Sequence, residues 1–305
     1  MAVTPPSESP RKLLWASVYR QLLRHALPDS RHNYDFLSFV PSFRGADDAV
    51  ARATSLSCYK EAKTLLVTSD NSLEGLRHQA LKDGKKVLVG TYRLRRGFVL
   101  LDPQRIGEGR LEVAACLDGM EKAGVGRRLE LAQLRDEGVE IDMCAVGGLV
   151  FNERGVVVWE GPALFEVQWA LLRDLEVLGP RAPVVALAHE CQVVDEARFG
   201  LEVIRAEGNG EVQCDFVVTP ERTLEVEDAV KPKGGVDFSK VDPEALNNIP
   251  PLQELKGIRM MEQIMSGSGF GTKEEEKKKE EPKAPSAEEQ MGIDIVERLM
   301  RGLKS

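Results

Sequence analysis

Residues 63–94, KTLLVTSDNSLEGLRHQALKDGKKVLVGTYRL, decide the fold class because they contain two apolar runs separated by one helical pattern. KTLLVTS (63–69) is typical of a short buried strand. NSLEGLRHQALKDG (71–84) has helical spacing and ends at a glycine, and KKVLVGTYRL (85–94) is a second strand. A strand, a helix and a strand within about 30 residues predict a parallel βαβ unit, since parallel strands need a crossover connection.

The same alternation continues on both sides of this unit. Several of the strands are apolar throughout, as expected when helices cover both faces of a sheet. The sequence therefore predicts an α/β domain with a mostly parallel sheet and helices on both faces. The further helices are predicted at 10–26, 45–62, 118–137 and 163–179, and the further strands at 98–103, 141–151, 156–159, 183–190 and 214–226.

Composition limits the class of protein. The chain has 305 residues, 42% of them hydrophobic, and a net charge of −8, which argues against nucleic-acid binding through a basic surface. No apolar run reaches the ~18 residues of a membrane helix, and the N-terminus has no signal- or transit-peptide pattern. The five cysteines include no C-x-x-C pair, which fits a reducing compartment. We expect a cytoplasmic protein that has no membrane contact.

The chain divides into five segments by composition. We expect a flexible N-terminus at 1–8, the α/β domain at 9–230 and an arm with one helix at 231–265. A low-complexity linker at 266–285 balances its lysines and glutamates, and 286–305 is predicted to be an amphipathic helix. The apolar stripe of residues 286–303 either docks on the domain or binds a protein partner, and both interpretations stay open.

One strand–turn–helix junction is the main candidate for chemistry. The segment GVVVWEGPALFEVQWALL (155–172) follows the strand at 141–151, and helix N-termini in such places usually bind phosphate. This turn, however, contains no lysine or arginine. Trp159 and Pro162 stand where a ligand needs room, and a proline has no N–H to donate.

Carboxylates beside this junction could serve a magnesium–nucleotide complex. Asp142, Glu166 and Asp215 each begin or follow a predicted strand. Mg²⁺ binds carboxylates together with substrate phosphates, so a shared site would suit these residues. Helix caps or ion pairs would explain each of them separately.

Three arginines in TYRLRRG (91–97) form a second candidate site. Arg93, Arg95 and Arg96 follow a predicted strand and would suit an anion such as a phosphate or a polyglutamate tail. A solvated turn explains them equally well.

Two other motifs are interpreted as structural rather than functional. His189 and Cys191 follow the strand at 183–190 and could form a nucleophilic pair, but a strand-end histidine beside a buried thiol is the simpler interpretation. GSGFGTK (267–273) lacks the spacing of a phosphate-binding loop and follows no strand, so it belongs to the linker.

The order of these motifs resembles the 5-formyltetrahydrofolate cyclo-ligase family. It is most similar to the divergent branch called methenyltetrahydrofolate synthetase domain-containing proteins. The resemblance implies a NagB/RpiA/CoA-transferase-like fold. It also implies MgATP as cofactor and a folate as substrate, with the formyl oxygen activated by phosphorylation. The resemblance is carried by SFRGADDAVARA (42–53), GKKVLVGTYRLRRGFVLLDP (84–103), IDMCAVGGLVFNERG (141–155), VVALAHECQVVD (184–195) and CDFVVTPERTLEV (214–226).

The resemblance also implies a phosphate loop of the form G-x-R-x-G-x-G-x-G, and this chain departs from it. Without the arginine, a charge-assisted hydrogen bond of about 1.5–3 kcal/mol is lost. Asp70 is a shortened substitute for a folate-binding glutamate. By family position, Gly155 and Gly161 keep glycines, Val157 replaces the arginine, Trp159 and Ala163 replace glycines, Glu160 stands at an often basic position, and Glu166 and Asp215 match metal-binding positions.

Two hypotheses follow. The leading one is a cyclo-ligase-like protein with a degraded ATP-phosphate loop, weakly active or inactive, that works as a binding or scaffold protein. The alternative is an active MgATP-dependent cyclo-ligase that converts 5-formyltetrahydrofolate to 5,10-methenyltetrahydrofolate and draws its cations from Arg93, Arg95 and Arg96. Some relatives bind RNA through an added domain, but this acidic chain shows no such domain.

Overall fold

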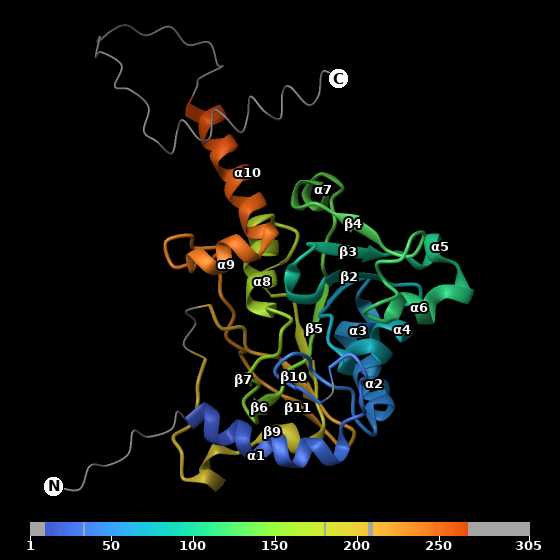
Figure 1. Ribbon diagram of the computed structural model, residues 1–305, viewed down its shortest axis with the longest axis vertical. Coiled ribbons are helices and arrows are strands. Elements are labelled where there is room, and N and C mark those ends of the chain that lie inside the picture. Colours follow the sequence, from blue (N-terminus) through green and yellow to red (C-terminus); the bar gives the residue numbers. More distant parts are fainter. Residues whose placement is uncertain (1–9, 33, 180, 207–209, 268–305) are drawn as a thin grey trace, which may run out of the picture. The chain divides into compact units, whose positions relative to one another are not determined.

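The computed structural model describes residues 10–32, 34–179, 181–206 and 210–267. It divides into two compact units, Met1–Pro251 and Leu252–Ser305, and both sheets belong to the first (Figure 1). The predicted N-terminal segment at 1–8 and the predicted helix at 286–305 lie outside the described residues.

The main sheet of the described residues has eight strands in the order β11-β10-β8-β5-β1-β2-β3-β4. The five strands from β10 to β2 are parallel, and β11, β3 and β4 join antiparallel. The α/β class and the mostly parallel sheet are therefore confirmed. The strands are β1 (Thr64–Val67), β2 (Lys86–Gly90), β3 (Phe98–Leu101), β4 (Arg127–Leu129), β5 (Met143–Val146), β8 (Val184–Leu187), β10 (Phe216–Val218) and β11 (Thr223–Glu225).

The predicted βαβ unit is present. Strands β1 and β2 pair in parallel, with Leu65 opposite Val87, and the helix α4 connects them. The helices of the described residues are α1 (Pro10–His25), α2 (Ala46–Ser55), α3 (Ser57–Glu61), α4 (Glu74–Lys82), α5 (Pro103–Ile106), α6 (Leu111–Ala115), α7 (Leu131–Asp136), α8 (Phe165–Asp174), α9 (Pro243–Asn248) and α10 (Pro250–Gly267).

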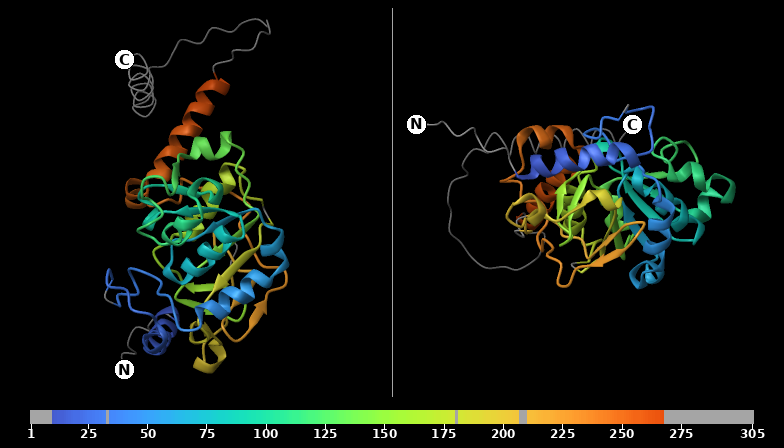
Figure 2. Two further views of the ribbon diagram at one scale, coloured as in Figure 1. Left: turned by 90° about the vertical axis from the view of Figure 1, so that its right-hand side faces the viewer. Right: turned by 90° about the horizontal axis from the view of Figure 1, so that it is seen from below.

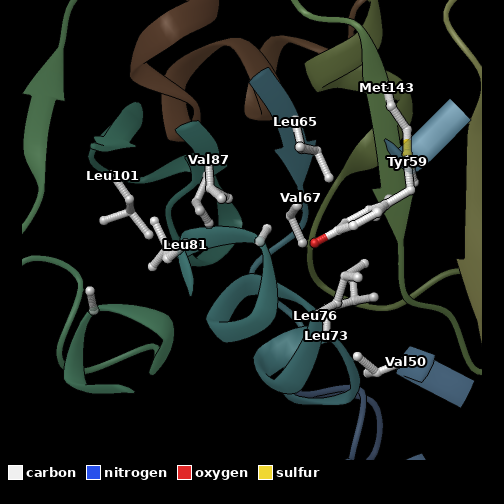
Figure 3. Close-up of a cluster of buried hydrophobic side chains, with 14 of the residues drawn as sticks. Val50, Tyr59, Leu65, Val67, Leu73, Leu76, Leu81, Val87, Leu101 and Met143 are labelled. Atoms are coloured by element: carbon white, nitrogen blue, oxygen red, sulfur yellow. The ribbon is translucent and has the colours of Figure 1, made fainter. Parts of the chain in front are cut away.

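The core lies on both faces of the main sheet. On one face, Leu65 and Val67 of β1 pack with Tyr59, Leu73 and Leu76 from the α3 and α4 region (Figure 3). Successive side chains of a strand point to opposite faces, so the residues between them face α8. Helix α8 lies on the other side of the sheet from α4 (Figure 1).

A second, three-stranded sheet in the order β7-β6-β9 lies beside the first and carries α1. Leu14, Val18 and Leu22 of α1 pack with Val150 and Val158 of this sheet. This cluster fixes the N-terminal helix next to the candidate junction. The strands are β6 (Val150–Asn152), β7 (Val157–Trp159) and β9 (Val193–Val194).

Several predicted elements are split in the structure. The strand expected at 141–151 becomes β5 and β6 in different sheets, with Gly147 and Gly148 between them. An added Cβ would lie 2.7 Å from the Asp70 side chain at Gly147 and 2.6 Å from the Phe151 ring at Gly148, so the chain passes close to both side chains there. The strand expected at 214–226 is the β10–β11 hairpin. The helix expected at 45–62 breaks at Leu56, whose ψ of 145° is extended.

The region 118–137, expected to be helical, contains strand β4 and the short helix α7 instead. In the predicted arm, two helices occur where one was expected, and α10 runs through Gly267 into the predicted linker. No helix among the described residues is both long enough and apolar enough to cross a bilayer.

Candidate functional site

Asp70 lies at the carboxyl end of β1 and is almost fully buried. The hydroxyl of Thr68 donates a hydrogen bond to its carboxylate, and the N–H of Gly147 donates to the Thr68 Oγ1 at 3.2 Å. Burial raises the pKa of Asp70, and the Thr68 hydrogen bond and the Arg77 charge oppose this rise. The end of β1 is thereby joined to the turn after β5.

Arg77 of α4 holds the Thr68–Asp70 loop in place through hydrogen bonds to its carbonyls. Its side chain is fully buried and donates from Nε to the Ala115 carbonyl at 2.7 Å. Its Nη1 donates to the carbonyls of Thr68 at 2.7 Å and Asp70 at 2.9 Å. Burial lowers the pKa of Arg77 to about 10, so the side chain stays charged at neutral pH. Arg77 therefore holds the loop after β1 in one conformation.

The 155–163 segment, which corresponds to the family's phosphate loop, is mostly a β-hairpin. Gly155 closes the turn between β6 and β7 with a φ of 75°, and an added Cβ would lie 2.5 Å from the Cys214 carbonyl oxygen. Val157 and Trp159 pair with β6. Gly155 is thus needed for the turn itself, and the backbone of β7 is engaged in the ladder rather than cradling phosphate.

The second half of this segment is covered by the chain itself. The ring of Trp159 stacks on Trp15 of α1, with centroids 6.0 Å apart. An added Cβ on Gly161 would lie 2.3 Å from a methyl of Val40 and 3.6 Å from the Asp70 carboxylate. The loop between α1 and α2 therefore fills the space in front of Gly161.

Glu160 occupies the N-terminus of α8. Its carboxyl accepts a hydrogen bond from the Phe165 N–H, in the place where a helix of an α/β enzyme usually binds phosphate. Burial raises the pKa of Glu160 to about 8, against the Phe165 hydrogen bond, and the charges of Glu166 and Asp70 add to the rise. Ala163 is buried behind it, and its carbonyl accepts from Gln168 at 2.8 Å.

The cavity beside this segment is small and acidic. It has a volume of about 140 Å³ and is lined by Glu160, Glu166, Glu211 and Arg11, together with apolar residues. Arg11 already pairs with Glu211 at 2.8 Å and donates to the Val158 carbonyl at 3.1 Å. Burial and the Glu211 charge raise the pKa of Glu166. The cavity therefore offers a triphosphate three acidic side chains, of which Glu160 is mostly protonated at neutral pH, and one cation that is already paired.

The arginines of the second candidate site have their own contacts at the end of β2. Arg93 lies over the ring of Tyr92, 5.4 Å from its centroid, and Arg96 pairs with Glu121 at 2.6 Å. All three arginines are exposed, Arg95 included. The contacts of Arg93 and Arg96 are therefore with Tyr92 and Glu121 rather than with the 155–163 segment.

The two metal candidates have different neighbours. Glu166 accepts from the Val212 N–H and faces Glu211. Both oxygens of Asp215 contact Lys231 Nζ, at 2.6 and 2.5 Å, and one also accepts from the Val184 N–H. In the described part of the chain, no group of three or more His, Cys, Asp or Glu side chains is arranged to hold a metal ion.

Asp142 has a structural role at the start of the sheet. It accepts from the N–H groups of Lys63 at 2.8 Å and Thr64 at 2.9 Å. It lines a cavity of about 310 Å³ at the amino-terminal edge of the strands, where the charged residues include the Arg127–Glu137 pair. This edge lies opposite the strand ends that carry Asp70.

His189 and Cys191 form a structural turn. The Nδ1 of His189 accepts from the Cys191 N–H at 3.1 Å, and its ring stacks on His25 with centroids 4.0 Å apart. Burial raises the pKa of the Cys191 thiol to about 11. A thiol with so high a pKa is a poor nucleophile at neutral pH.

Sequence patterns missed the residues that close the site. Arg11, Trp15, Val40 and Glu211 reach the 155–163 segment from distant parts of the chain. Arg77 lies within a predicted helix, where a charged residue usually faces solvent. In the sequence, the departures from the family's phosphate-loop pattern were the signal that pointed to this segment.

Comparison with known proteins agrees with the resemblance. The profile of the 5-formyltetrahydrofolate cyclo-ligase family matches residues 16–197. Methenyltetrahydrofolate synthase domain-containing proteins from Mus musculus and Danio rerio are each 27% identical, over 78% and 72% of this chain. The human protein is 26% identical over 71% of the chain. The chain spans 54% to 63% of the length of these relatives.

Two solved structures are also similar. The 5,10-methenyltetrahydrofolate synthetase of Aquifex aeolicus has a TM-score of 0.42 and 16% identity, over 72% of this chain and 94% of that chain. The synthetase of Mycoplasma pneumoniae has a TM-score of 0.37 and 12% identity, over 69% and 98%. The family profile alone covers more than half of the sequence. This chain belongs to the 5-formyltetrahydrofolate cyclo-ligase family.

Proposed function

We propose that this chain is a cyclo-ligase-like protein that has lost efficient MgATP-dependent catalysis and works as a binding or scaffold protein. The observation that carries the proposal is the position of Glu160, whose carboxyl accepts from the first N–H of α8. Phosphoryl transfer needs cations and N–H donors around the transferred group. Here the Glu160 carboxyl accepts the hydrogen bond that the Phe165 N–H would otherwise donate to a phosphate. Glu166 and Glu211 line the adjacent cavity.

Packing supports the same conclusion. Trp159 stacked on Trp15 and Val40 packed against Gly161 fill the approach to the segment. A nucleotide would have to displace an aromatic pair and the loop between α1 and α2. Displacing such contacts would cost free energy that the few available phosphate contacts would not offset.

The test is an assay of the purified 305-residue chain with 5-formyltetrahydrofolate and MgATP. We expect no 5,10-methenyltetrahydrofolate above the enzyme-free control, whereas the Aquifex aeolicus synthetase, assayed in parallel, should form it. Circular dichroism confirms that the protein assayed is folded. Turnover at an ordinary enzyme rate of about 1 per second or more would overturn the proposal and establish the alternative, an active cyclo-ligase.

Ligand binding gives a second, independent measurement. A ligand that binds only the folded state raises the melting temperature by mass action. We expect saturating MgATP to leave the melting temperature of this chain unchanged. Calorimetric titration with MgATP, with and without 5-formyltetrahydrofolate, separates loss of catalysis from loss of nucleotide binding.

A further inference from the structure

Helix α1 carries apolar side chains that stay exposed in the described part of the chain. The sequence places Leu13, Leu14, Leu22 and Leu23 in one helical pattern, but the structure buries only Leu14 and Leu22 of these four. Leu13 is 41% exposed and Leu23 is 40% exposed. Figure 1 shows α1 along one end of the first unit, and in the right-hand view of Figure 2 its outer side faces away from the sheets.

The exposed residues follow heptad spacing. Leu13, Ala16, Arg20, Leu23 and Leu27 are separated by three, four, three and four residues, and all are exposed. Leu27, just beyond the helix end, is 43% exposed. Within α1, the spacing of Leu13, Ala16, Arg20 and Leu23 is that of the a and d positions of a helix that packs against another helix. The seam, defined here as these four residues and Leu27, is narrow because the broad apolar face of α1 is already buried.

The charged residues of α1 itself are all positive. Helix α1 contains Arg11, Lys12, Arg20 and Arg24 and no acidic residue, although the whole chain has a net charge of −8. Arg11 is paired with Glu211. Within the described residues, no acidic side chain pairs with Lys12, Arg20 or Arg24; the Arg20 Nε donates to the Ala16 carbonyl. The seam is therefore complementary to a negatively charged surface.

We propose that the seam binds an acidic amphipathic helix of a partner protein, with apolar residues at its own a and d positions and Asp or Glu beside them. A second copy of this helix would bring like charges together, which is destabilising. A membrane would contact only three leucines around Arg20, whereas interfacial helices bury a broad apolar face. Arg20 at an a position would fix the register of the acidic partner.

The direct test uses a synthetic probe and the purified 305-residue chain. The probe is a fluorescein-labelled helix of about three heptads with Leu at a and d and Glu at e and g. A control peptide has Lys at e and g. We expect fluorescence anisotropy to show binding of the acidic probe that weakens with added salt, and no binding of the basic peptide.

Charge reversal on the seam should abolish this preference. The pair Arg20→Glu and Arg24→Glu is expected to weaken acidic-probe binding by about tenfold or more. The conservative pair Arg20→Lys and Arg24→Lys should retain binding. Lys82→Glu is the matched control, because Lys82 is an exposed cation in the last turn of α4, as Arg24 is in α1. Melting curves confirm that each variant is folded.

Three outcomes would overturn the proposal. One is equal binding of the acidic and basic peptides, and another is acidic-probe binding that Arg20→Glu with Arg24→Glu leaves unchanged. The third is cosedimentation with phosphatidylserine–phosphatidylcholine vesicles without peptide binding, which would assign the surface to lipid. None of these measurements depends on MgATP or folate, so failure here is distinguishable from failure of the proposed function.

Discussion

Glu160 links proton binding to stability at the N-terminus of α8. Its pKa is raised by burial to about 8 from 4.5. The folded protein holds this proton more tightly than the unfolded chain, so the free energy of unfolding falls as pH rises from about 4.5 to about 8. Glu160→Gln keeps a carbonyl acceptor for the Phe165 N–H and cannot ionise.

We therefore expect the melting temperature of the wild type to fall more than that of Glu160→Gln between about pH 5 and about pH 9, by a few degrees. Differential scanning calorimetry measures both. Glu225→Gln, an exposed carboxyl on β11, is the control and should follow the wild type. Equal pH dependence of wild type and Glu160→Gln would contradict this prediction.

Arg77 is expected to be a major determinant of stability. Arg77→Leu removes three hydrogen bonds to backbone carbonyls and leaves Asp70 buried without its nearby positive charge. Breaking such a buried contact costs about 3–5 kcal/mol. Urea unfolding gives the free energy. Arg95→Leu, at an exposed position, should change it by less than about 0.5 kcal/mol, and a similar loss in both variants would argue against the role of Arg77.

These residues differ in how far sequence could predict them. Asp70 could be singled out because it stands where the family that the chain resembles carries a folate-binding glutamate after the first strand. Arg77 could not, because its burial depends on the carbonyls of Ala115 and Thr68, which only the folded chain brings together. Helical spacing alone does not show that a cation will be enclosed.

Packing between elements determines the conformation of the 155–163 segment. Gly161→Ala would place a methyl 2.3 Å from Val40, so we expect a loss of about 1–3 kcal/mol. Val40→Ala makes room, and the double variant should therefore be more stable than the sum of the two changes predicts. An added Cβ at Gly109 would have no neighbouring atom within 4 Å, so Gly109→Ala is the control. If the changes in unfolding free energy of the two single variants simply add up in the double variant, as measured by urea unfolding, Val40 and Gly161 do not contact each other.

At the level of elements, the buried parallel strands were predictable because each is an apolar run. Strand β4 was not, since Arg127 and Arg128 give it no apolar pattern and it pairs along one side only, with β3. The division of 141–151 into β5 and β6 was hidden for the opposite reason. Its apolar character continues through both strands, although they belong to different sheets.

The cysteines of the whole molecule provide a test of its compactness. Cys144 and Cys214 are buried, and Cys58, Cys116 and Cys191 are partly buried; all five are free. Burial raises the pKa of Cys116 to about 11 and that of Cys214 to about 12. We expect a thiol reagent at neutral pH to label the native protein at least about tenfold more slowly than the urea-unfolded chain.

Mass spectrometry identifies which cysteines react. Labelling should begin at the partly buried residues, and Cys144 and Cys214 should react only on unfolding. Reducing agent should not change the melting temperature, because no disulfide is present among these cysteines. Rapid native labelling of Cys144 would show that the main sheet opens readily.

Across the whole molecule, sequence predicted the fold class but not the closure of the site. The βαβ order depends on neighbours along the chain, and so local patterns reveal it. The closure depends on Trp15 meeting Trp159 and on Val40 meeting Gly161, residues more than a hundred positions apart. The family resemblance predicts a changed loop from the missing arginine at Val157, whereas the packing around that loop becomes visible only in the folded chain.

The hydrogen bond from Phe165 to Glu160 has a consequence for crystallography. Some segments that contact phosphate, such as the switch loops of GTPases, become ordered only when the phosphate is bound. In this chain the side chain at the start of α8 belongs to the turn itself, so order there should not depend on any added molecule. Crystals grown without nucleotide or folate should therefore give continuous electron density from Gly155 to Phe165, and soaking in a nucleotide should leave that density unchanged.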